Sequence, residues 1–112
     1  IPACLLPFTA ELEIDEAAYR RHLSDLAGVQ GVSAITVNGH AAEVHALSFE
    51  EQQRALAVAC DEVGASVPVI AGISTTRCRE AARLAAMAEQ EGAACLLLFP
   101  QRGAVAGGTA PA

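Results

Sequence analysis

Four continuously apolar runs recur along the chain, with starts about thirty residues apart. They are ACLLPF (3–8), SAITVN (33–38), VPVIAGI (67–73) and ACLLLFP (94–100). Strands of a parallel sheet are buried on both faces, so they read as unbroken apolar runs instead of alternating ones. The pattern therefore predicts about four parallel strands.

Three amphipathic helices are predicted between these runs, over residues 15–27, from residue 48 onward, and over about 75–91. Asp15 is placed to cap the first helix, and Ser48 and Glu51 have the spacing of a capping box at the start of the second. Gly92 follows the last periodic residue of the third helix and predicts its end. We expect the hydroxyl residues of the preceding segment, 74–76, to cap that helix.

The resulting βαβαβαβ order is typical of an α/β protein, either an open doubly wound sheet or part of a (β/α)8 barrel. Neither Gly-x-Gly-x-x-Gly nor Gly-x-x-x-x-Gly-Lys occurs, and the absence of these phosphate-binding motifs argues against a nucleotide-binding fold. The stretch QRGAVAGGTAPA (101–112) is rich in Gly and Ala and has no periodicity. We predict one domain over residues 1–100 and a disordered tail over residues 101–112.

Composition narrows the classes of function. The formal charge of -6 argues against a nucleic-acid partner, because phosphate binding needs clustered cations. The four cysteines, at positions 4, 60, 78 and 95, form no Cys-x-x-Cys pair and suit buried positions in a reducing cytoplasm. No apolar run is long enough to span a bilayer. All seven basic side chains are arginines, and the chain has no lysine.

The stretch VNGHAAEVHALS (37–48) holds the candidate chemistry. It follows the second predicted strand, at the end where parallel α/β folds place their ligands, and glycine there lets backbone N–H groups approach an anion. A metal site built from His40, Glu43 and His45 is an alternative. However, the spacing of five between the histidines does not fit the one-turn spacing of metalloprotease helices.

Three stretches together resemble the N-terminal part of the dihydrodipicolinate synthase / N-acetylneuraminate lyase family. IPACLLPFTAELEIDEAAYRRHLSDL is similar to the family's first strand, Pro-Phe turn and Asp-initiated helix. VNGHAAEVHALSFEEQQRAL is similar to its second strand, Gly-Thr-Thr-Gly-Glu loop and second-helix start. VPVIAGIS and REAARLAAMAEQEGAACLLLFP are similar to its third strand, third helix and fourth strand, so the resemblance covers roughly residues 1–100.

The resemblance implies a partial (β/α)8 barrel of about four strands and three helices, from a cytoplasmic pyruvate aldolase that often assembles as a homo-oligomer and needs no cofactor or metal. It places Gly39, His40 and Ala41 where the family binds the carboxylate of pyruvate, and gives Asn38 and Glu43 a structural role in the loop. The family's paired threonines are replaced here by His40 and Ala41. The hydroxyl relay is therefore lost, and His40 is a candidate proton shuttle.

Class I aldolases form a Schiff base between a lysine amine and the ketone of the substrate. In the family, this lysine and its partner tyrosine lie beyond the region that these residues resemble. We therefore expect a fragment of a keto-acid lyase with no catalytic residue of its own apart from His40, cut short or shifted in reading frame after residue 100. The alternatives are a non-enzymatic half-barrel that binds a small anion or serves as a scaffold, and a metal-dependent hydrolase.

Overall fold

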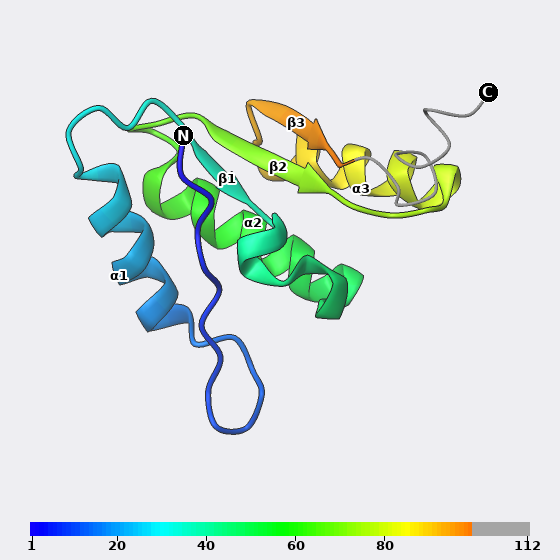
Figure 1. Cartoon of the computed structure of the whole chain (residues 1–112), viewed down its shortest axis with the longest axis horizontal. Coiled ribbons are helices and arrows are strands. Elements are labelled where there is room, and N and C mark those ends of the chain that lie inside the picture. The colour runs from blue at the N-terminus through cyan, green and yellow to red at the C-terminus, as the bar shows by residue number, and fades with distance from the viewer. Residues whose placement is uncertain (100–112) are drawn as a thin grey trace, which may run out of the picture.

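The computed structural model describes residues 1–99, which form a parallel sheet flanked by helices (Figure 1). The three strands are β1 (Ile35–Val37), β2 (Val69–Ile73) and β3 (Cys95–Leu98). The three α-helices are α1 (Glu16–Ala27), α2 (Phe49–Val63) and α3 (Cys78–Glu91), and two short 3₁₀ turns, η1 (His40–Ala42) and η2 (Val44–Ala46), follow β1. The α/β order predicted from the sequence is confirmed. The predicted tail, with residues 100–112, lies outside the described residues.

The strands lie side by side in chain order, β1-β2-β3, and both pairs are parallel. Val37 is level with Ala71, and Ile73 is level with Leu98. This register brings the carboxyl ends of the three strands to one edge of the sheet. The segments that follow the strands, including the two 3₁₀ turns, therefore begin at that edge.

The first predicted strand is shorter than expected. Ala3 forms a single parallel bridge with Thr36, supported by hydrogen bonds from the N–H of Cys4 to the Thr36 carbonyl (3.0 Å) and from the Thr36 N–H to Pro2 (2.9 Å). The pairing stops there for two reasons. Asn38 has a φ of 61°, which turns β1 away from the partner segment. The N–H of Leu5 donates instead to Nε2 of His22 on α1, at 2.9 Å.

Local signals set most helix ends. Asp15 Oδ1 accepts from the N–H of Ala18 at 3.1 Å, and both bonds of the predicted capping box between Ser48 and Glu51 are present. Gly92 ends α3 with a φ of 99°, as predicted for a glycine C-cap. The start of α3 was predicted too early. The helix begins at Cys78, because the hydroxyl of Thr75 accepts from the N–H of residue 77 and forms a turn before the helix.

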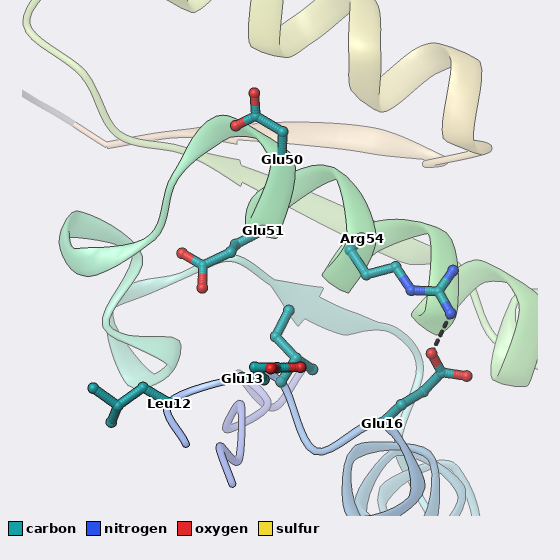
Figure 2. Close-up of a pocket in the computed structure, with 7 residues that line it drawn as sticks. Leu12, Glu13, Glu16, Glu50, Glu51 and Arg54 are labelled. Atoms are coloured by element: carbon teal, nitrogen blue, oxygen red, sulfur yellow. Dashed lines mark hydrogen bonds and ion pairs between the residues drawn. The ribbon is translucent and has the colours of Figure 1, made fainter. Parts of the chain in front are cut away.

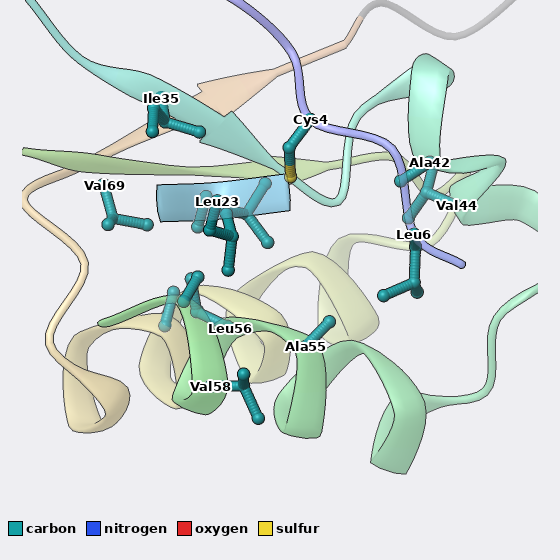
Figure 3. Packing of buried hydrophobic residues seen from close by; sticks show 14 of the residues in the cluster. Cys4, Leu6, Leu23, Ile35, Ala42, Val44, Ala55, Leu56, Val58 and Val69 are labelled. Atoms are coloured by element: carbon teal, nitrogen blue, oxygen red, sulfur yellow. The ribbon is translucent and has the colours of Figure 1, made fainter. Parts of the chain in front are cut away.

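The core lies between the sheet and the helices (Figure 3). Tyr19 and Leu23 of α1, Ile35 of β1 and Leu56 of α2 are fully buried there. Helix α1 packs on α2, and α2 packs on α3, so the helices form one layer over the sheet. The Tyr19 hydroxyl donates to the carbonyl of Ala55 at 2.9 Å, which ties α1 to α2 inside this layer.

Strand β3 is the outer strand of the described sheet, and all four of its residues are exposed. Leu96, Leu97 and Leu98 are 42%, 41% and 65% exposed, although their sequence pattern is that of a buried strand. Residues 1–99 contain no helix that is both long and apolar enough to cross a membrane.

Candidate functional site

The residues predicted to bind the ligand lie in the loop between β1 and α2, at the carboxyl edge of the sheet. Asn38 anchors this loop. Its side chain is 2% exposed, and its Nδ2 donates to the carbonyl of Gln52 on α2 at 3.0 Å. Gln52 is buried as well and donates through Nε2 to the carbonyl of Leu47, at the other end of the loop, at 3.4 Å. One short polar chain thus holds both ends of the loop against α2.

Between these anchors the backbone makes two 3₁₀ turns that meet at Glu43, which has a φ of 54° in the left-handed region. The first turn closes through hydrogen bonds from Ala42 to Gly39 (3.2 Å) and from Glu43 to His40 (3.0 Å). Within residues 1–99, the N–H groups of His40 and Ala41 make no hydrogen bond. The first N–H groups of a helical turn lack internal acceptors and are suited to bind an oxyanion.

The two histidines of the loop lie close together and are both exposed. The ring centroids of His40 and His45 are 5.6 Å apart, and the ring of His40 stacks on Phe99 with centroids 4.3 Å apart and planes 23° apart. Glu43, which lies between the two histidines in the sequence, does not join them. No group of three His, Cys, Asp or Glu side chains in residues 1–99 is arranged to hold a metal ion. The described geometry therefore gives the metal-hydrolase alternative no support.

Phe99 is a component of this region that the sequence reasoning missed. It follows β3, and its ring lies over the ends of the two other strands. A Cβ placed on Gly39 would be 3.6 Å from its Cζ, and one on Gly72 would be 3.0 Å from its Cε2. Cγ2 of Thr36 lies 3.6 Å from the same Cβ position on Gly39. The sequence placed Phe99 inside the run 94–100, which was predicted as a strand, whereas β3 ends at Leu98. An aromatic residue near the carboxyl end of that run was the signal that could have pointed to it.

A separate pocket of about 340 Å³ lies between the segment before α1 and the first turn of α2 (Figure 2). It is lined by Leu12, Glu13, Ile14, Glu16, Glu50, Glu51 and Arg54. Arg54 pairs with Glu16, and this hydrogen bond, together with a second one from Arg20, lowers the pKa of the Glu16 carboxyl. None of the predicted site residues lines this pocket, so it is distinct from the loop that follows β1.

Comparison with known proteins agrees with the geometry. The dihydrodipicolinate synthetase family matches residues 1–100. The 4-hydroxy-tetrahydrodipicolinate synthase of Methanopyrus kandleri is 41% identical over 100 residues, which are 87% of this chain and 32% of that protein. A probable 5-dehydro-4-deoxyglucarate dehydratase of Pseudarthrobacter chlorophenolicus is 39% identical over 95 residues, covering 83% of this chain and 30% of that protein.

Solved structures give the same result. The crystal structure of dihydrodipicolinate synthase from Aquifex aeolicus superimposes with a TM-score of 0.80 at 31% identity, over 86% of this chain and 32% of that one. The chain thus spans about a third of the length of the proteins it matches. The predicted architecture, part of a (β/α)8 barrel, is confirmed. The chain belongs to the dihydrodipicolinate synthetase family, whose members similar to it are synthases and related lyases.

Proposed function

We propose that this chain supplies the part of a keto-acid lyase that binds the substrate carboxylate, within an aldolase acting on pyruvate or a related keto acid. The observation that carries the proposal is the pair of unused N–H groups of His40 and Ala41, on a loop that begins at the carboxyl end of β1. Main-chain donors hold a carboxylate whatever their side chains are, so the loss of the family's two threonines leaves this function possible.

The proposed reaction needs an amine from outside these residues. A lysine amine would add to the ketone and lose water to give an iminium, and removal of the neighbouring proton would then give the enamine that attacks the second carbonyl compound. In the cleavage direction, the C–C bond of the iminium adduct would break, releasing that compound and leaving the same enamine. The 112 residues contain no lysine. The chain alone is therefore proposed to bind keto acids without forming this intermediate.

His40 is proposed to move the proton that the family's loop hydroxyls handle. The His40 imidazole is exposed and is held by its stack on Phe99. The backbone N–H of the same residue is one of the two proposed carboxylate donors. A positioned imidazole can accept and return a proton at neutral pH. The small side chain of Ala41 leaves the approach to the second N–H open.

Two variants at one position test the carboxylate site. His40→Pro removes the backbone donor, and a proline is tolerated there because it opens the 3₁₀ turn and follows Gly39 in an extended conformation. His40→Phe removes the imidazole but keeps the N–H and the ring stack. In a titration with pyruvate followed by amide NMR, we expect His40→Phe to bind like the parent chain and His40→Pro to bind about tenfold more weakly.

A fusion tests the chemistry. Residues 1–99 would be joined to the remaining part of the Methanopyrus kandleri synthase, incubated with pyruvate and borohydride, and mapped by peptide mass spectrometry. We expect a trapped lysine in the fusion, and in the chain alone at most an adduct on the α-amine of Ile1. A fusion that folds and binds pyruvate but traps no lysine adduct would contradict the Schiff-base part of the proposal. Equal pyruvate affinity of the two His40 variants would contradict the carboxylate site.

A further inference from the structure

We propose that His40 and His45 form a subsite for a second carboxylate of the substrate, so that the enzyme favours a keto acid with two carboxylates over pyruvate. This inference rests on the proposed function, because it places the subsite next to the donors that hold the first carboxylate. From the sequence, the two imidazoles were considered together only as ligands of a metal ion, not as a subsite for a carboxylate.

The first support is that the two rings are near each other and have open nitrogens. Their centroids are 5.6 Å apart, and within residues 1–99 their ring nitrogens make no hydrogen bond. The third histidine differs, since Nε2 of His22 accepts from the N–H of Leu5 at 2.9 Å. Charge-assisted hydrogen bonds to a carboxylate are about 2.7–2.9 Å long. In the proposed subsite, a carboxylate beside the pair accepts from one nitrogen of each ring.

The second support is the stack on Phe99. The ring planes of His40 and Phe99 are 23° apart, with centroids 4.3 Å apart, so a face of His40 is covered while its edge remains available. The stack also fixes the direction of the His40 ring, which lowers the entropy cost of binding.

The third support is the position of the pair in the loop. His40 contributes both a backbone N–H of the proposed carboxylate site and one of the two imidazoles. The loop segment 38–47 contains no lysine or arginine, and its one acidic residue, Glu43, lies on the left-handed turn between the two histidines. The imidazoles are therefore the side-chain donors that this loop can offer to a second anionic group.

The experiment is an NMR titration of the isotope-labelled chain with pyruvate and with 2-oxoglutarate, a keto acid with two carboxylates. The chain has three histidines, so the imidazole signals of His40 and His45 can be followed with His22 as an internal control. We expect 2-oxoglutarate to bind about tenfold more tightly than pyruvate and to shift the signals of both loop imidazoles. His40→Phe and His45→Phe, which keep a flat ring without nitrogens, should each abolish most of this preference. His45→Phe, whose residue lies outside the proposed carboxylate site, should also leave pyruvate binding unchanged.

The outcomes separate this inference from the proposed function. If the amides of His40 and Ala41 respond to both ligands with equal affinity, or if the preference survives in both Phe variants, the subsite is wrong while the carboxylate site stands. If the imidazoles respond to Zn²⁺ but not to 2-oxoglutarate, the pair is a metal site and the inference is overturned. If pyruvate leaves both amides unchanged, the proposed function fails and the subsite fails with it.

Discussion

Gly72 allows β1 and β2 to approach closely at the edge that carries the candidate site. A Cβ at this position would lie 2.5 Å from the carbonyl oxygen of Asn38 and 3.0 Å from its carbonyl carbon. It would also lie 3.0 Å from Cε2 of Phe99. Gly72→Ala therefore forces the ends of two strands and an aromatic ring to move at once.

The size of the effect follows from what must move. The nearest atoms belong to backbone and cannot change rotamer, and Asn38 is already held by its hydrogen bond to Gln52. Overpacking of a well-packed region costs about 1–3 kcal/mol. We expect a loss of about 2 kcal/mol in the free energy of unfolding, which lowers the Tm of a domain of this size by about 8–16 °C.

Gly39→Ala is the matched control. The Cβ that it adds would be 3.6 Å from both Phe99 and Thr36, which is an ordinary contact distance. Gly39 also has a φ of -94°, which alanine adopts without strain. Thermal unfolding followed by circular dichroism should therefore show a Tm equal to or slightly above that of the parent chain.

Amide NMR adds a second readout, because displacement of Asn38 should also shift the signals of His40 and Ala41. If Gly72→Ala melts at the same temperature as Gly39→Ala and leaves these signals in place, the two strands do not approach each other as described. The explanation of how the site is positioned would then be wrong.

Three further predictions concern titration and capping. Burial raises the pKa of the Tyr19 hydroxyl, and it raises the pKa of the Cys4 thiol to about 11. The free energy of unfolding should therefore be highest below the unfolded-state pKa values of the two groups and should fall as the pH rises above them. Tyr19 is the only tyrosine, so near-ultraviolet absorbance should show phenolate only as the chain unfolds; phenolate in the folded chain near pH 10 would refute this. The pKa of the Glu16 carboxyl is lowered, first by its hydrogen bond to Arg54. The folded chain therefore gains stability above the unfolded-state pKa of about 4.3 and loses it as the pH falls through the folded-state pKa. Glu16→Gln should reduce the fall in Tm that is measured on acidification. Ser48→Ala breaks the capping box and should cost about 1 kcal/mol in urea unfolding, while an unchanged midpoint would show that the cap is not formed in solution.

The sequence predicted those parts of the fold that depend on neighbouring residues. The caps at Asp15 and Ser48 and the glycine end of α3 were correct, because each joins groups within a few residues of one another. The start of α3 was predicted too early, because a turn closed by the Thr75 hydroxyl precedes the helix. The strand predicted over residues 3–8 pairs with β1 through a single bridge, at Ala3, because that pairing depends on where β1 ends.

The candidate site shows the same division. Gly39, His40 and Ala41 could be proposed from their place after an apolar run and from the family resemblance, and their assignment to a carboxylate remains a prediction. The stack of His40 on Phe99 and the close approach of Asn38 to Gly72 both join segments that are far apart in the sequence. Such contacts leave no periodic pattern in any one segment.

By itself, the sequence determined that this is a parallel α/β chain with three helices, two of them with side-chain N-caps, and with no lysine for Schiff-base chemistry. Composition, apolar runs and caps are properties of local segments. Only the tertiary structure decided that two histidines and a phenylalanine lie together beside two unused N–H groups. It also showed that the leucines of β3 are exposed at the outer side of the described sheet, although the strand is as apolar as a buried one. Both features arise when strands distant in the chain are brought into register.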